Sequence, residues 1–446
     1  MQRKTIRKAV GAALGCIWAV MVFAQEYQVS GGAKPPLLAL DNTLHRIQVW
    51  LVCGMEGLTL SHTSASATHR WYRYRTRALD YEPVASTQQG ALSTVNHPEE
   101  GYGYFVMEGD NPAMAHFIWL IDYSRYPVNF QNLHAAEQAD DLCEALRLAG
   151  VNDTPPLAYR TPVGDAAVVE RYFEISYMTQ IWNESLSQFV SALVIDTLRG
   201  DPLNASVKPP LSDTEIQLTG DFFARHFGME KTFSAGQYQA VALSVRADTL
   251  LLSNHQTNMS AGENELLAPA TIRFTAHANT PVAALHIWQV YRAEEPNSPL
   301  VRFPEATMEY TFDRVGEYIV RLEVSDRSGK CVNTENTYRV SITETQMMVP
   351  NAFTPEGSPG VNDVFKVAYK SVVRFQGWIF NRWGAELFRW TDPSQGWDGK
   401  YRGKYVPAGA YFYVIEYTGT DGKDHRKSGD INVIRSTRLK NNTHTE

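Results

Sequence analysis

The chain has 446 residues, with 41 Lys or Arg against 48 Asp or Glu and a formal net charge of −7 at pH 7. This length excludes a single compact core and predicts about three or four domains. Charges of both signs are spread along the chain without long blocks, which argues against a nucleic-acid partner.

Residues 1–24 have the pattern of a secretory signal peptide. An apolar stretch over residues 9–23 ends at Ala24 and follows a basic start formed by Arg3, Lys4, Arg7 and Lys8. We predict cleavage after Ala24, with lipid attachment at Cys16 as the alternative. The stretch is shorter than the roughly 20 residues that a membrane-spanning helix needs, and no later segment is long enough to span. We therefore expect an exported protein that is not transmembrane.

The cysteines that remain after this cleavage are Cys53, Cys143 and Cys331. An odd number of cysteines in an oxidising compartment leaves at least one thiol unpaired. We expect buried free thiols, with a bridge between Cys53 and Cys143 as the alternative. No Cys-x-x-Cys spacing indicates a metal site.

Most of the chain consists of short runs rich in β-branched and aromatic residues, separated by clusters of Gly, Pro, Asn and Asp. This pattern predicts a mainly β fold of serial immunoglobulin-like β-sandwich domains. Strands are expected at residues 47–52, 102–107, 117–123 and 318–324. In the last of these, Tyr318, Val320, Leu322 and Val324 alternate with polar residues, as in a half-buried strand.

One short helical insertion is predicted at residues 133–149. Apolar or small residues recur there at a spacing of three to four, and Gly150 supplies a stop. Turn-forming residues cluster at residues 151–156, 253–263 and 346–350. We therefore expect domains at residues 25–155, 156–260, 261–346 and 347–446.

Two segments share a pattern in which a strand and a turn-rich loop precede a strand that carries a tryptophan. They comprise residues 58–74, with Trp71, and residues 272–291, with Trp288. A large indole commonly fills the space between the sheets of a sandwich. Trp288 and residues 310–326 give residues 265–345 a resemblance to a PKD (polycystic kidney disease type) domain. That resemblance implies a spacer or docking module.

Blocks of Gly, Pro, Asn and aromatic residues recur in order through the last hundred residues. Residues 348–436 are similar to the gliding-motility-associated, type B C-terminal domain used by the type IX secretion system of Bacteroidota. The residues that carry the similarity are Asn351, Phe353, Pro355, Asn362, Asp363, Phe365, Asn381, Arg382, Trp383, Gly384, Trp397, Asp398, Gly399, Pro407, Gly409, Tyr411, Gly429 and Asp430.

This resemblance implies an exported protein that is recognised by the type IX machinery and kept at the cell surface, at the outer membrane or outside the cell. We expect Trp383 and Trp397 to pack as anchors of a small sandwich. Family members have an acidic loop that could hold calcium, but residues 355–363 are longer here and have one aspartate replaced. No metal and no cofactor is therefore predicted.

The first half of the chain carries no catalytic signature. Its histidines form no HExxH motif, and neither GxSxG nor a P-loop occurs. Residues 70–77 alternate arginines with aromatic residues, which we interpret as protection of a strand edge, with sugar stacking as the alternative. We expect a non-catalytic structural or interaction protein, either an accessory of the secretion and gliding apparatus or an adhesin, which contacts other envelope proteins or surface glycans. The alternative is a surface hydrolase or glycan-binding protein with its site in residues 27–255.

Overall fold

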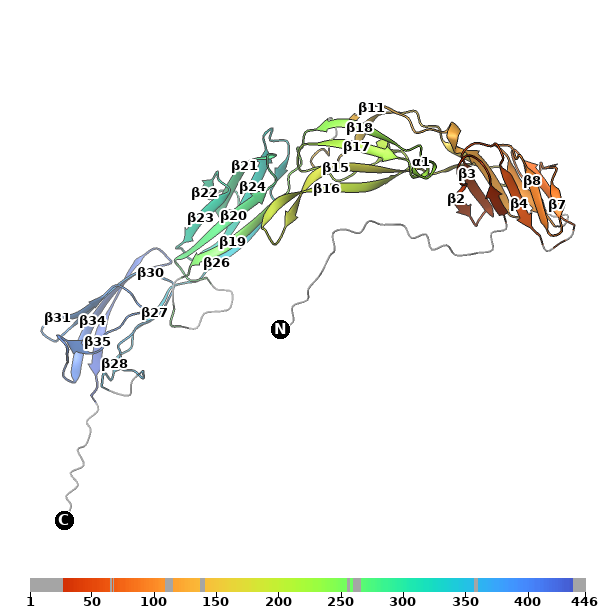
Figure 1. Ribbon diagram of the computed structural model, residues 1–446. Helices are drawn as coiled ribbons and strands as arrows, with labels where there is room; N and C mark the ends of the chain where they lie inside the picture. Colours follow the sequence, from red (N-terminus) through yellow and green to blue (C-terminus); the bar gives the residue numbers. More distant parts are fainter. Residues whose placement is uncertain are drawn as a thin grey trace, which may run out of the picture.

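The computed structural model describes residues 27–435, apart from residues 65, 67, 109–114, 137–140, 255–256, 260–265 and 357–359. The predicted signal peptide at residues 1–24, with Cys16, lies outside the described residues. Within them the chain is mainly β-strand and forms four β-rich units that follow one another in an elongated row (Figure 1). The predicted class of serial β-sandwiches is confirmed.

The first unit packs a four-stranded sheet on a six-stranded sheet. The smaller sheet has the order β1 (Tyr27–Ser30), β4 (Thr59–Thr63), β8 (Leu92–Asn96), β7 (Thr87–Gln89). The larger has the order β2 (Leu37–Asn42), β3 (Ile47–Val52), β10 (Phe117–Asp122), β9 (Gly103–Met107), β5 (Arg70–Tyr74), β6 (Glu82–Pro83). Trp71 lies in the core between the sheets and is 1% exposed, as predicted.

Both faces of the larger sheet are covered. One face meets the smaller sheet, and the other packs against a hairpin of β13 (Leu157–Arg160) and β14 (Ala166–Val169) and against α1 (Phe222–Phe227). Strands β3 and β10 are therefore buried along nearly their whole length. Burial on both faces explains why their sequences are almost continuous apolar runs.

The second unit is built around a four-stranded antiparallel sheet. Its order is β16 (Gln188–Arg199), β15 (Tyr172–Asn183), β17 (Thr214–Gly220), β18 (Lys231–Tyr238). The hairpin of β11 (Phe130–Ala135) and β12 (Leu148–Asn152) packs on it through Phe130 and Leu148. The chain thus leaves the first unit for β11 and β12, returns for β13 and β14, and leaves again at β15.

The predicted helix at residues 133–149 is wrong. Residues at both ends of that range belong to β11 and β12, where His134 pairs with Ala149. Leu148 is buried against the main sheet, so tertiary packing overrides the helical spacing. Gly150 does not stop a helix; it lies in β12, where an added Cβ would come within 2.9 Å of the carbonyl oxygen of Gln131.

The third unit is a sandwich of two sheets. One has the order β19 (Val245–Ser253), β20 (Ala270–Ala278), β23 (Thr307–Phe312). The other has β22 (Pro299–Phe303), β21 (Ala283–Arg292), β24 (Gly316–Asp326), β25 (Val332–Asn333), with β26 (Thr337–Ile342) also paired to β24. Trp288 is fully buried between them, and Tyr318, Val320, Leu322 and Val324 alternate into the core as predicted. Strand β19 pairs with β20 here, although we expected the second domain to extend to residue 260.

The fourth unit contains a five-stranded sheet and three smaller pairings. The sheet has the order β28 (Ala352–Phe353), β35 (Asp424–Val433), β34 (Gly409–Gly419), β30 (Val372–Phe380), β31 (Glu386–Trp390). Two-stranded ladders join β27 (Gln346–Met348) to β29 (Ala368–Lys370) and β32 (Lys400–Tyr401) to β33 (Lys404–Tyr405). An isolated bridge joins Phe365 to Trp397.

A buried ion pair fastens the first unit to the second. Nη1 of Arg171 donates to Oδ2 of Asp221 at 2.6 Å, and the Tyr123 hydroxyl donates to Oδ1 of Asp221 at 2.6 Å. Nη2 of Arg171 donates to the backbone oxygens of Tyr126 and Pro155. Asp221 and Tyr123 are fully buried, and Asp221 also caps α1 through the N–H of Ala224.

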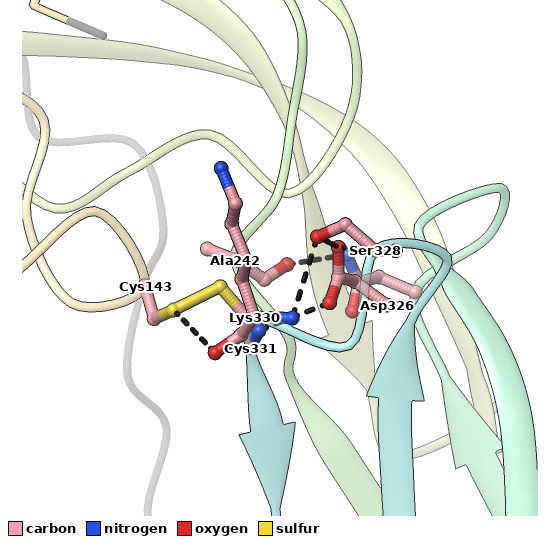
Figure 2. Close-up of a disulfide and its surroundings, with 7 residues drawn as sticks. Cys143, Ala242, Asp326, Ser328, Lys330 and Cys331 are labelled. Atoms are coloured by element: carbon pink, nitrogen blue, oxygen red, sulfur yellow. Dashed lines mark hydrogen bonds between the residues drawn. A yellow bond between two sulfur atoms is a disulfide. The ribbon is translucent and has the colours of Figure 1, made fainter. Parts of the chain in front are cut away.

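A disulfide between Cys143 and Cys331 fastens the second unit to the third (Figure 2). Cys143 lies between β11 and β12, and Cys331 precedes β25. The Asp326 carboxylate accepts from the N–H of Cys331 at 2.9 Å and from Ser328, which orders the turn that carries Cys331. Cys53 stays unpaired, as expected for at least one cysteine, but Cys143 and Cys331 are not free thiols and the alternative Cys53–Cys143 bridge is wrong. The bonded partners lie 188 residues apart in sequence and are brought together by the junction.

Hydroxyl groups fasten the third unit to the fourth. The N–H of Thr420 donates to Oγ1 of Thr345 at 2.7 Å, and the N–H of Val315 donates to the carbonyl of Thr420 at 2.9 Å. The loop that connects β19 to β20 also reaches the fourth unit. There Asn258 accepts from the N–H of Tyr369 at 2.9 Å and donates to the carbonyl of Val367 at 2.7 Å.

The buried ion pair predicts a large effect of a single substitution. Asp221→Ala leaves the Arg171 guanidinium buried without its counter-charge, so we expect the unfolding transition that includes the first junction to lose about 3–5 kcal/mol. The matched control is Glu170→Ala, which removes an exposed carboxylate bound to Arg199 and should cost less than about 1 kcal/mol. Urea denaturation followed by tryptophan fluorescence measures both, and equal losses would contradict the role assigned to the pair.

The disulfide predicts one free thiol in the purified mature protein. Alkylation under denaturing, non-reducing conditions should label Cys53 alone, and Cys53→Ser should abolish the labelling. Mass spectrometry of a non-reduced digest should detect a peptide pair that joins Cys143 to Cys331. Labelling at Cys143 in the oxidised protein would contradict this arrangement.

Candidate functional site

The residues singled out in the last module gather at one end of the fourth unit. Strand β30 begins beside the contacts with the third unit and ends at Phe380, whereas β34 begins at Gly409 and ends beside Thr420. The turn after β30 and the start of β34 are therefore at the end away from the third unit. We call this the distal end.

Four separate segments meet around the indole of Trp397 at this end. Phe365 and Trp397 exchange backbone hydrogen bonds of 2.9 and 3.0 Å. The rings of Phe353 and Tyr411 each lie 5.5 Å from that of Trp397, and Nε1 of Trp397 donates to the carbonyl of Lys400 at 3.0 Å. Trp397 is fully buried, so its predicted role as a packing anchor agrees with the structure.

Glycines at two positions allow this close packing. Gly399 has φ +75°, and an added Cβ would lie 2.7 Å from Cβ of Pro355. Gly429 lies opposite Tyr413 in the β34–β35 ladder, and an added Cβ would come within 2.8 Å of the Tyr413 hydroxyl. A side chain at either position would force these segments apart.

Strand β28 closes the distal end by pairing in parallel with the end of β35. Ala352 pairs with Asn432, and the carbonyl of Asn351 accepts from the N–H of Asn432 at 2.9 Å. Asp430 lies two residues earlier in the same strand, opposite Phe412. The Tyr411 hydroxyl donates to the carbonyl of Pro407 at 2.9 Å, which ties down the segment before Gly409.

The turn from Asn381 to Gly384 holds Trp383 outside the core. Oδ1 of Asn381 accepts from the N–H groups of Trp383 and Ala385, each at 3.0 Å, and Gly384 takes φ +81°. Trp383 is 75% exposed, and the guanidinium of Arg382 lies 4.2 Å from the centre of its indole. The expectation that Trp383 anchors the sandwich is wrong, because this turn directs its side chain to solvent.

The loop before Phe365 and the turn after Trp397 are ordered by their acidic residues. Oδ2 of Asp363 accepts from the N–H of Gly360 at 2.9 Å, and the carbonyl of Asn362 accepts from the N–H of Thr354 at 2.7 Å. The Asp398 carboxylate contacts Nζ of Lys400 at 3.0 Å and raises the pKa of Lys400 above its ordinary value. Residues 357–359, in the loop that replaces the acidic loop of the family, lie outside the described residues. In the rest of the described chain, no group of three or more His, Cys, Asp or Glu is placed to hold a metal ion.

The arginine-rich run at residues 70–77 serves the structure of the first unit. Arg73 contacts the carboxylates of Glu82 at 2.6 Å and Glu99 at 2.7 Å, and its guanidinium covers the ring of Tyr102. Trp71 and Tyr74 point into the core. These contacts give Trp71, Arg73 and Tyr74 a structural role in the first unit, in a strand that lies between β9 and β6.

Sequence reasoning missed a polar cluster in the first unit. The hydroxyl of Ser64 donates to Glu108, and Nε2 of His62 lies 3.7 Å from Oε1 of the same carboxylate. The hydrogen bond from Ser64 is the main cause that lowers the pKa of Glu108, and the contact with His62 lowers it further. A carboxylate held ionised in this way is a poor general acid. No sequence spacing could reveal the cluster, because Ser64 and Glu108 follow the ends of two different strands, β4 and β9, and lie 44 residues apart.

Two family models match parts of the chain. Residues 347–433 match the CHU_C type IX secretion signal domain, and residues 135–235 match a fibronectin type III domain. The first match confirms the predicted secretion signal and indicates an exported protein. The second agrees with the β-sandwich fold and spans the boundary that we expected near residue 155. The comparison with curated proteins finds no match.

Solved structures with tandem β-sandwiches are similar only in outline. The tetra-tandem repeat in the extending region of a large adhesion protein is 12% identical, covers 85% of this chain and 96% of its own, and has a TM-score of 0.19. Domains FN1–FN3 of chicken CNTN1 are 12% identical, with coverages of 69% and 98% and a TM-score of 0.22. Such low TM-scores support no argument about this chain. No helix in its described part is long and apolar enough to cross a membrane.

The two tryptophans predict opposite outcomes when each is truncated. Trp397→Ala removes a buried indole that four segments share, so we expect a loss of about 3–5 kcal/mol in the unfolding free energy of the fourth unit. Trp383→Ala removes an exposed side chain and should change it by less than about 0.5 kcal/mol. Urea denaturation of the full mature chain measures both, and a large loss for Trp383→Ala would contradict the exposed position.

Proposed function

We propose that this chain is a non-catalytic surface protein that the type IX machinery of a Bacteroidota cell carries across the outer membrane. The match of residues 347–433 to a secretion signal domain is the observation that carries the proposal. The fourth unit holds the protein at the cell surface or at the machinery. The first three units form the cargo, and residues 265–345 act as a PKD-like spacer.

The arrangement of the units supports a role in projecting the first unit outward. The first and fourth units lie at opposite ends of the row (Figure 1). Each junction is fastened by a different means: the buried pair of Arg171 and Asp221, the Cys143–Cys331 bond, and the hydroxyl contacts of Thr345 and Thr420. A row fixed in this way places the first unit at a set distance from the anchored end. There it contacts other envelope proteins or surface glycans, as an adhesin or as an accessory of the apparatus.

Deleting residues 348–446 tests the export step. We expect the shortened protein to accumulate in the periplasm, because the signal peptide still directs it across the inner membrane. The control lacks only residues 436–446 and keeps every motif residue of the distal end, so it should reach the surface. Protease accessibility on intact cells measures the outcome. Surface exposure of the protein that lacks residues 348–446 would overturn the proposal.

A further inference from the structure

The exposed Trp383 is held in place by its own turn. Four hydrogen bonds from and to Asn381 and the positive φ of Gly384 define the turn, so the backbone that carries the indole has little conformational freedom. Trp390 in the same unit is 3% exposed and Trp397 is fully buried, whereas Trp383 is 75% exposed. Leaving a large apolar ring in water adds nothing to folding. Its fixed display therefore points to a contact outside the chain.

A second exposed element lies at the same end. Strands β32 and β33 form a small hairpin whose turn residues, Arg402 and Gly403, have φ +49° and +80°. Positive φ at both central residues is the signature of a tight hairpin turn, and it is uncommon for arginine. The guanidinium of Arg402 lies 5.2 Å from the ring of Tyr401, which is 38% exposed, and Nζ of Lys400 lies 4.8 Å from the ring of Tyr405, which is 37% exposed.

Trp397 and Tyr411 connect the two elements. The indole N–H of Trp397 binds the carbonyl of Lys400 at the base of the hairpin, and its ring contacts Tyr411. Phe380, the last residue of β30, pairs with Phe412, so the turn that carries Arg382 and Trp383 begins beside Tyr411 at the start of β34. The turn that carries Trp383 and the hairpin that carries Arg402 thus both lie next to the packed pair of Trp397 and Tyr411.

In the part of the chain that the structure describes, the two arginines of these elements, Arg382 and Arg402, are not neutralised by carboxylates, whereas Lys400 pairs with Asp398. Elsewhere in the chain, exposed arginines such as Arg77 and Arg273 pair with Asp80 and Glu309. Within the described residues, neither Arg382 nor Arg402 makes an ion pair, and Lys404 beside them makes none. The distal end therefore combines exposed aromatic rings with unpaired positive charge.

We propose that Arg382, Trp383, Tyr401, Arg402, Lys404 and Tyr405 form a docking surface for an acidic face of a protein of the secretion machinery. This inference rests on the proposed function and names the surface through which the signal domain is recognised. Trp, Tyr and Arg are the residue types that dominate binding energy at protein interfaces, and their preorganised display lowers the entropic cost of docking. The residues project from two convex turns, a shape that a concave protein surface encloses. Unpaired cations around them steer an acidic partner into place.

Charge reversal tests the surface in the full-length protein. The variant Arg382→Glu/Arg402→Glu, with and without Trp383→Ala, should reduce surface exposure on intact cells at least tenfold and leave the protein in the periplasm. The matched control is Arg374→Glu/Lys423→Glu, which makes the same change of charge at the opposite end of the same unit and should export normally. Circular dichroism and the urea midpoint of each purified variant establish that the fourth unit stays folded.

Sedimentation with outer-membrane preparations identifies the class of partner. Purified mature protein should bind membranes from the host at 0.05 M salt, lose at least tenfold in binding at 0.5 M salt because the charges are screened, and lose binding after the membranes are treated with protease. Binding that survives protease treatment would assign the surface to an anionic polysaccharide or lipid and overturn the proposal. Equal binding by the charge-reversal variant and its control would overturn it as well.

The two proposals fail in different ways. If the protein that lacks residues 348–446 reaches the surface, the export proposal is wrong. If that deletion blocks export but the charge-reversal variants are exported normally, the domain is the signal and only the docking surface is wrong.

Discussion

The buried contact between Arg171 and Asp221 constrains how the first unit is oriented relative to the second. Taking two charges out of water is costly, and the cost is offset by their mutual attraction together with hydrogen bonds from the groups around them. Here Tyr123, the carbonyls of Tyr126 and Pro155 and the first turn of α1 supply such hydrogen bonds, whereas Nε of Arg171 is buried without one. Arg171 and Asp221 flank the paired strands β15 and β17 of the second unit, and their bonds to Tyr123 and Tyr126 reach the first unit. A different angle between the two units would break those bonds, so they favour the observed arrangement.

The two later junctions solve the same problem with other chemistry. The second junction uses a disulfide between two loops. The third uses the hydroxyl group of Thr345 and hydrogen bonds from Asn258 in the β19–β20 loop. The first junction also has an apolar contact, because α1 packs in the core of the first unit, whereas the third and fourth units each have a core of their own. Fixed junctions turn serial sandwiches into one elongated body.

Sequence patterns predicted the features that depend on local periodicity. The alternation of Tyr318, Val320, Leu322 and Val324 reveals a half-buried strand, and the tryptophan strands reveal two sandwich cores. The features that the patterns missed depend on partners far away in the chain. Residues 133–149 have helical spacing but pack as strands, and Cys143 finds Cys331 only because the junction forms. Trp383 and Trp397 both lie beside a glycine, yet a turn stabilised by Asn381 exposes the first and a bridge to Phe365 buries the second.

The disulfide also decides which parts of the chain carry mechanical load. When the two ends of the row are pulled apart, tension passes from residue 143 directly to residue 331 through the sulfur atoms, so the intervening chain is excluded from the path. Strands β15 to β24 lie within that excluded loop. A loop of 188 residues would otherwise lengthen by roughly 600–700 Å when unravelled. In a protein anchored at one end and loaded at the other, unfolding of the two central sandwiches would therefore lengthen only the short segments outside the loop, which hold β11, β25 and β26.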